Sequence, residues 1–420
     1  MAVQEARAPF SLLALAILLL MLFSGLALLS AASWLPGSTL LATLADRLGS
    51  ATGVALRLAA LTGLAGGGLM VARASGLRPA RLLVAGWASY AVISVLATTL
   101  QPESPIRYAL AATEAALLIV SVIAAGRHSW RTPVGLVWGA GIGLAAVASV
   151  ATLLPAGDPL SALFVDRVAG GLRDWLAFPL AAQALAYWLA GRFSTVGADW
   201  ADESLLTTAG LMALAGMLAT LSRLPPLVVT SWVIHAANGA TLLMPLLALI
   251  VVAHAYRTLA NRSRASTLAA HWTALAWLLF LLGFGVLMPL TGMPVIREWA
   301  AGTLLDQSAA LFASLFPLSV IPGMVNQVAA ELHGKDGRIT GLMPFWLVAF
   351  GWLIAGSSLA VAGVIQIYVG RVLGVPAGDV LVLLEPVFVL CAFGWLSGAT
   401  GVLVYGLAFW YRRPPVSQTP

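Results

Sequence analysis

The sequence predicts an all-α, polytopic membrane protein, and three observations carry this prediction. Of the 420 residues, 60% are hydrophobic and 9% are charged, with a mean hydropathy of +0.96. Too little polar surface remains to cover a soluble domain of this length. The apolar residues form runs of about 20, the length that crosses a hydrocarbon core of roughly 30 Å. The third observation is the uneven placement of the arginines along these runs.

Twelve apolar runs predict about twelve transmembrane helices. The predicted helices lie near residues 10–33, 50–72, 82–99, 108–126, 133–154, 170–191, 205–221, 228–254, 271–291, 303–330, 343–370 and 381–410. The longest connections, near 155–169 and 192–204, remain short loops. We therefore expect residues 1–420 to form a single transmembrane domain.

The basic residues predict the orientation, because cytoplasmic loops of membrane proteins collect lysine and arginine. If the N-terminus is cytoplasmic, fourteen basic residues fall at inner ends of the helices and six at outer ends, with Arg47 and Arg57 in or beside the second helix. Both termini are therefore predicted to be cytoplasmic in a multi-pass protein of the cell (inner) membrane. The net charge of +6 then reflects topology and contact with the lipid bilayer, and no nucleic-acid partner is expected.

Seven polar residues are candidates for an intramembrane site, because each falls within the first few turns after a predicted outer loop. They are Arg57, Glu114, Arg173, Asp174, His235, Asp306 and Glu385. An ionised side chain at the centre of a spanning helix costs roughly 2.5–3.5 kcal/mol by insertion scales, so such groups usually face the bundle interior and pair. Arg57 and Glu114, each expected about 10 Å below the outer surface, are the predicted ion pair.

Two interpretations of these seven residues remain open. They could form a structural network whose ion pairs set the register of the helices. Alternatively, they could line a cavity for a proton, a quinol-like head group or a small polar solute, with Glu114, Asp306 and His235 as its titrating groups. Gln183, Gln366, Asn238 and Asn326 could extend the cavity, or could instead satisfy backbone groups freed near prolines.

The C-terminal half carries a resemblance to a known family over roughly residues 228–413. Five motifs carry it in chain order. The first two are Met244-Pro245 within 232–259, and Trp272 to Trp277 followed by Gly283-Phe284-Gly285. The others are Gly302 to Leu305 followed by Asn326-Gln327, Phe345 to Trp352 followed by Val361 to Gln366, and Glu385-Pro386 before Trp410 to Arg413. In order and spacing they resemble the eighth to twelfth spans of the heme-copper oxidase catalytic subunit, in the branch of the C-type oxidases and nitric oxide reductases. Twelve spans with both termini inside is also that family's arrangement.

The resemblance implies cofactor ligands that this chain lacks. Family members hold two hemes and a copper ion with six histidines, and only five histidines occur here. At the implied positions stand Ser50 or Ala51 in the second span, Leu172 or Arg173 in the sixth, Thr220-Leu221 in the seventh, and Ala309 and Leu311 in the tenth. None of these can bind copper or axial heme iron as the family does. No cofactor is therefore expected. A heme bound through His235 and an unusual second ligand remains an alternative.

Three classes of function follow from these observations. The first is an oxidase-like subunit without cofactors, with a structural or interaction role in a membrane complex beside other membrane or periplasmic subunits. The second is a proton-coupled carrier or quinone-interacting protein that uses the outer polar residues. The third is an active redox enzyme with displaced heme ligands. The single cysteine, Cys391, excludes a disulfide or a multi-thiolate metal site within the chain.

Overall fold

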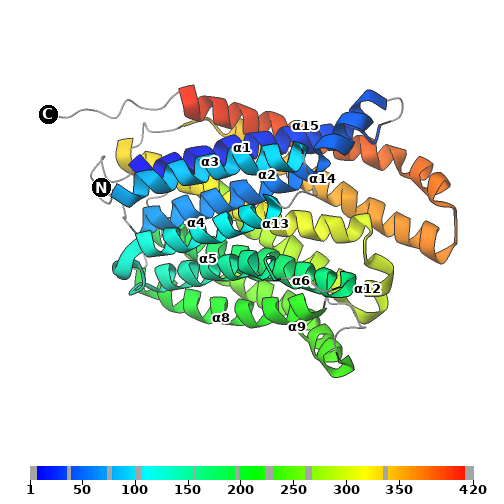
Figure 1. Ribbon diagram of the computed structural model, residues 1–420, viewed down its shortest axis with the longest axis horizontal. Helices are drawn as coiled ribbons and strands as arrows, with labels where there is room; N and C mark the ends of the chain where they lie inside the picture. Colours follow the sequence, from blue (N-terminus) through cyan, green and yellow to red (C-terminus); the bar gives the residue numbers. More distant parts are fainter. Residues whose placement is uncertain are drawn as a thin grey trace.

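The computed structural model describes residues 7–35, 39–72, 78–100, 106–154, 158–193, 198–222, 230–260, 267–333 and 339–411. Nearly all of these residues are helical, and no strand occurs in the described ranges. The long helices pack side by side in one elongated bundle (Figure 1). The predicted all-α class is therefore confirmed.

The helices follow the apolar runs of the sequence. Five single helices come first: α1 (Arg7–Ala32), α2 (Thr39–Val71), α3 (Arg78–Leu100), α4 (Ile106–Ser129) and α5 (Pro133–Ala151). A continuous helix follows, made of α6 (Pro159–Leu172), the π-helical turn η1 (Arg173–Ala177) and α7 (Phe178–Phe193). Next come α8 (Ala198–Ser222), α9 (Ser231–Ala260), and α10 (Thr267–Phe280) with η2 (Leu281–Leu287) and α11 (Met288–Gly292). The last are α12 (Pro294–Ala300), α13 (Leu304–His333), α14 (Met343–Ile365) with η4 (Gln366–Val372), and α15 (Ala377–Tyr411).

Ten helices in the described ranges are long and apolar enough to cross a membrane, which establishes a multi-pass membrane protein. The continuous helix from α6 to α7 and helix α8 do not meet that criterion, since charged residues interrupt the first and only a shorter apolar stretch, 204–214, lies in the second. Both correspond to predicted spans, at 170–191 and 205–221. The count of twelve spans accordingly stays a prediction.

The two ends of the described chain lie at the same end of the bundle. Helix α1 begins beside the end of α15, and the rings of Phe10 and Phe409 are 5.4 Å apart (Figure 1). We call this end the near face and the opposite end the far face. An even number of crossings follows from this arrangement. The arginine distribution predicts that the near face is cytoplasmic.

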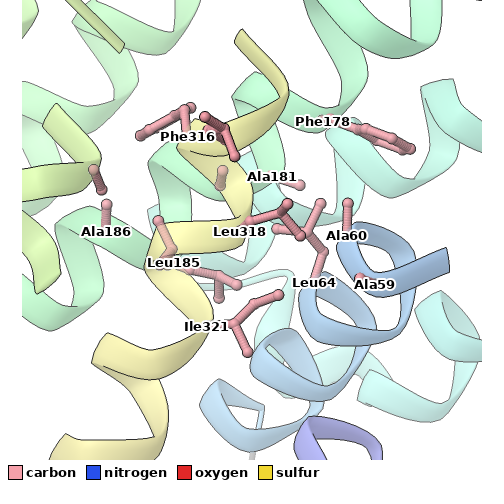
Figure 2. Close-up of a cluster of buried hydrophobic side chains, with 14 of the residues drawn as sticks. Ala59, Ala60, Leu64, Phe178, Ala181, Leu185, Ala186, Phe316, Leu318 and Ile321 are labelled. Carbon is pink, nitrogen blue, oxygen red and sulfur yellow. The ribbon is translucent and has the colours of Figure 1, made fainter. Parts of the chain in front are cut away.

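Helices α2, α7 and α13 meet in the centre of the bundle. The side chains between them are small or aliphatic, including Ala59, Leu64, Leu185 and Ile321, and they interdigitate (Figure 2). Helix α5 is tied to this centre, because the indole N–H of Trp138 donates to the Leu64 carbonyl at 2.9 Å. The middle of the protein is therefore a closed apolar core.

Local signals explain where α6 and α5 begin. Asp158 caps α6 by accepting the Ser161 amide at 2.8 Å, and Pro159 follows it in the first turn. Thr132 and Pro133 start α5 in the same way. These caps fix the depth at which α5 and α6 place their side chains in the bundle.

Candidate functional site

A polar cavity of about 540 Å³ opens in the far face of the bundle. It lies where α3 and α5 end, where α4 and α6 begin, and beside the middle of α2. Its lining residues are Arg57, Thr98, Arg107, Tyr108, Leu110, Ala111, Glu114, Ser149, Thr152, Leu154, Ala162, Leu163, Val165, Asp166 and Arg173. Three of the seven predicted polar residues therefore share one cavity.

The predicted ion pair between Arg57 and Glu114 is confirmed. An Nη2 nitrogen of Arg57 lies 3.3 Å from Oε2 of Glu114. Glu114 sits eight residues into α4, about 12 Å from its start, and is only 2% exposed. Arg57 keeps 31% of its side-chain area exposed, so it reaches from the floor of the cavity toward its opening.

Two hydroxyl groups complete the surroundings of the Glu114 carboxylate. Tyr90 on α3 donates its O–H to Oε2, and Ser149 on α5 donates to Oε1 at 2.7 Å. With Arg57 from α2, donors from three neighbouring helices converge on one side chain of a fourth. A carboxylate that accepts this many hydrogen bonds tolerates burial in its ionised form, because the donors replace the water that it has lost.

Arg173 enters the cavity from the π-helical turn η1. In this turn the Phe178 amide bonds to the Arg173 carbonyl, five residues back, which widens the helix by one residue. Single π-turns of this kind occur often at functional sites. The Nε of Arg173 donates to Oδ1 of the neighbouring Asp174 at 2.9 Å, and the carboxylate of Asp174 is 46% exposed. Arg173 also interacts electrostatically with Glu114 and Asp166.

The rim of the cavity carries a further charge of each sign. Arg107, at the start of α4, lies 5.0 Å from the ring centroid of Tyr108, and Asp166 is exposed on α6. Neither residue was predicted as part of the site, and Tyr90 and Ser149 were also missed. Arg107 could have been found from its position at the start of a predicted span, whereas Asp166 falls in the predicted loop 155–169 and the sequence carries no signal for the two hydroxyls.

The remaining predicted residues do not line this cavity, which corrects the expectation of one cluster. His235 is exposed near the start of α9, and Glu385 is exposed on α15. Asp306 is half-buried in the first turn of α13 and does not line it either. The physical reason is that a similar depth along the bundle axis does not place two residues on the same side of the bundle. Glu114 is thus the one member of the predicted titrating trio that the cavity contains.

None of the four predicted neutral residues lines the cavity, and Gln183, Gln366 and Asn326 bond to the backbone or to neighbouring helices instead, while Asn238 is buried on α9. Asn326 donates to the Pro322 carbonyl at 2.7 Å and to the Tyr405 hydroxyl at 2.9 Å. Gln366 accepts the Leu304 amide at 3.0 Å, and Gln183 donates to Thr208 at 3.0 Å. For Asn326 the interpretation as a partner of backbone near a proline is confirmed.

The residues present do not fit the hemes and copper of the oxidase family. Ala309 and Ala51 are buried apolar residues, and the Thr220 hydroxyl is bonded to the Gly216 carbonyl at 2.9 Å. Among the described residues, no three histidine, cysteine, aspartate or glutamate side chains come together as a metal site would require. His271 packs against the rings of Phe345 and Trp346.

We expect the substitution His235→Ala to leave the visible spectrum and the iron and copper content of the purified protein unchanged. The reason is that His235 is exposed on the outside of α9 and therefore lacks the enclosing pocket of an axial ligand. Absorption spectroscopy with elemental analysis of the wild type and the variant measures this. A Soret band that disappears in the variant would contradict the expectation and reopen a redox function.

The fold and the cavity together define a class: an all-α, multi-pass integral membrane protein with a charged cavity in one face. No family model matches this chain, and no curated protein matches it either. The chemistry of the cavity residues is accordingly the basis for any functional assignment.

Proposed function

We propose that the protein is a proton-coupled carrier of a small polar solute in the cell (inner) membrane, with the near face cytoplasmic. The observation that carries the proposal is the Arg57–Glu114 ion pair in the wall of a cavity formed by helix ends at the far face. Intramembrane ionisable residues that face a cavity are characteristic of substrate and proton pathways. Glu114 would carry the proton, and Arg57 would respond to its charge.

The closed centre of the bundle supports a carrier over an open channel. Ala59, Ala60 and Leu64 follow Arg57 on α2, and Ala181 and Leu185 follow Arg173 on the α6–α7 helix. These side chains are almost completely buried and belong to the apolar core of Figure 2. This core lies between the cavity and the near face. A site with access to one face and an apolar barrier toward the other is the arrangement that alternating access requires.

Protonation of Glu114 supplies the coupling step. With Glu114 ionised, its attraction for Arg57 holds α2 against α4. Once Glu114 is neutral, that attraction is lost and the guanidinium group is free for a solute or for water. A two-state element biased by one proton is sufficient to shift the population of outward-open and closed forms.

We also propose that the scaffold is related to the oxidase catalytic subunit, without its redox centre. The resemblance puts the missing ligands on the second, sixth, seventh and tenth spans, and these spans have to be neighbours in any such protein. In the bundle, α2, α7 and α13 contact one another and α8 packs on α7. This neighbourhood supports the proposed relationship, and the apolar side chains at its centre occupy the space between the same helices.

The carrier proposal can be tested by the accessibility of the cavity in proteoliposomes. Ala111 lines the cavity, so an Ala111→Cys variant in a Cys391→Ala background reports on its opening to an impermeant maleimide. We expect the labelling rate from the far face to fall about tenfold between pH 7.5 and pH 3.5, because the Arg57 ion pair and the two hydroxyl donors keep Glu114 ionised near neutral pH and only acid protonates it, which shifts the population toward the closed form. Adding Glu114→Gln should give the low rate at both pH values.

A matched reporter corrects for the pH dependence of the thiol itself. Arg167 is exposed on α6 and does not line the cavity, so Arg167→Cys serves as the reference. If the ratio of the two rates is the same at both pH values and in the Glu114→Gln protein, proton-coupled opening is rejected.

An interaction subunit is the second candidate, and one observation favours it. The hairpin of η4 and α15 extends beyond the rest of the bundle at the far face (Figure 1, right). The ring of Trp34, at the end of α1, lies 5.0 Å from that of Phe388, so residues 377–387 continue for about 16 Å past α1. Exposed apolar side chains on this hairpin include Val372, Leu373 and Leu381 to Leu383. A carrier works alone in liposomes, whereas an interaction subunit would show no gating there.

A further inference from the structure

We infer that the ligand of the far-face cavity is a small organic monocarboxylate, bound by Arg57 and Arg173 while Glu114 takes up one proton. This inference rests on the proposed carrier function and names its substrate class. Three independent features of the cavity support it: the balance of charge, the unused hydrogen-bond donors of the arginines, and the apolar part of the wall.

The charges around the cavity cancel when Glu114 is ionised. Arg57, Arg107 and Arg173 supply three positive charges, and Glu114 and Asp166 supply two negative charges in the lining. Asp174, bonded to Arg173, supplies the third negative charge. A bound monoanion would leave one uncompensated negative charge in a half-buried site, which is costly. One proton on Glu114 restores neutrality, so a monoanion and one proton enter as a matched pair.

The two inner arginines have donors available for such an anion. Arg173 uses its Nε for Asp174, and no described residue accepts a hydrogen bond from its two Nη nitrogens. Arg57 holds Glu114 through one Nη nitrogen only. Protonation of Glu114 removes the charge that this nitrogen pairs with. A guanidinium group presents its N–H donors as a planar fork that matches the two oxygens of a carboxylate.

The rest of the wall favours an organic ligand over an inorganic anion. Leu110, Ala111, Leu154, Leu163 and Val165 also line the cavity, together with Tyr108. A volume of about 540 Å³ falls within the range typical of small-molecule sites, in which apolar walls bind the body of a ligand and a few polar groups orient it. Inorganic phosphate would leave this apolar surface unused.

Calorimetry on the full chain in phosphatidylcholine nanodiscs tests the inference, with benzoate as the probe. We expect saturable benzoate binding with uptake of about one proton per benzoate, counted from titrations in buffers of different ionisation enthalpy. Benzamide, which has the same shape without the charge, should bind at least about tenfold more weakly, because it cannot form the charge-assisted pair. Equal binding of both compounds would overturn the inference.

Variants assign the binding to the named residues. Arg173→Gln should weaken benzoate binding about tenfold to a hundredfold, and Arg167→Gln, on the exposed surface of α6, should leave it unchanged. In Glu114→Gln binding should persist without proton uptake. Because Arg57→Gln leaves Glu114 buried without its cation, the double variant Arg57→Gln/Glu114→Gln is the safer test, and benzoate affinity within twofold of the wild type in a folded double variant would refute the role of Arg57.

Other sources of an anion give different results. If the site takes a lipid phosphate, phosphatidylglycerol in the nanodiscs should abolish benzoate binding. If the site takes inorganic phosphate, phosphate should displace benzoate at concentrations lower than those at which benzoate itself binds. Either result overturns the carboxylate assignment. Binding at equilibrium does not require alternating access, so the failure of this experiment and the failure of the accessibility experiment are separate. Benzoate binding without pH-dependent gating would keep the ligand assignment and reject the carrier.

Discussion

Replacing Arg57 with alanine is expected to lower the free energy of unfolding by about 2–3 kcal/mol. Glu114 is 2% exposed and would lose the ion-pair partner that the described residues provide, keeping the hydroxyls of Tyr90 and Ser149 as donors. Breaking a buried pair from one side costs more than the pair itself contributes, because the remaining charge stays desolvated. Arg57 is partly exposed, so the expected cost lies below that of a fully buried pair.

The matching substitution Glu114→Gln should cost less, about 1 kcal/mol, because Arg57 can turn toward water in the cavity. The double variant Arg57→Ala/Glu114→Gln should then be no less stable than Arg57→Ala alone, giving a coupling energy of about 1–2 kcal/mol. Unfolding in mixed micelles, followed by tryptophan fluorescence, measures all three. Arg167→Ala is the control for losing an exposed arginine on a neighbouring helix. Strict additivity of the two single effects would show that the pair contributes no interaction.

The ion pair could be predicted from the sequence because an unpaired charge inside a spanning helix is destabilising. A charge in a spanning helix needs a partner, and Arg57 and Glu114 were expected at equal depth with opposite sign. Tyr90 and Ser149 could not be predicted in the same way, because buried hydroxyls occur in many helices and usually bond to the preceding turn. Ser149 itself also bonds to the Ala145 carbonyl at 3.0 Å.

Depth along a helix follows from the position of the loops, but the side of the bundle on which a residue lies depends on packing. For this reason Arg57, Glu114 and Arg173 came together as expected, whereas His235, Asp306 and Glu385 lie elsewhere. The helices that carry the first three are neighbours through α5, which contacts α2, α4, η1 and α7. Helix α15 instead packs on α1 and α14, which leaves the far-face half of α15, with Glu385, away from the cavity.

The apolar centre and the charged cavity are two consequences of the same helix arrangement. Where α2 and α7 approach α13, their residues are alanine, leucine and glycine, and the space between them closes (Figure 2). Toward the far face, α2 and the π-helical turn η1 that precedes α7 contribute Arg57 and Arg173 to the lining of the cavity instead. The packed side chains of α2, α7 and α13 therefore separate the cavity from the near face.

The second large effect is expected at the contact between α14 and α15. Gly351→Ala should lower the free energy of unfolding by about 3 kcal/mol, because a Cβ there would lie 2.6 Å from the Gly398 Cα and 2.7 Å from the Gly394 carbonyl oxygen. Both obstacles are backbone atoms of α15, so no side-chain rotation can relieve the clash, and the two helices have to separate along their length. Close backbone approach at small residues is what holds neighbouring helices together in a bilayer, where apolar burial alone gives no preference for protein over lipid.

Gly378→Ala is the matched control within α15, since a Cβ at Gly378 meets no atom within 4 Å. It should leave stability unchanged or raise it slightly, because alanine is the better helix former. The same fluorescence-detected unfolding reports both variants. A Gly351→Ala protein as stable as Gly378→Ala would mean that α14 and α15 do not pack through these glycines. A protein destabilised at Gly351 that still labels normally at Ala111→Cys would show that the α14–α15 pair supports the bundle without taking part in opening the cavity.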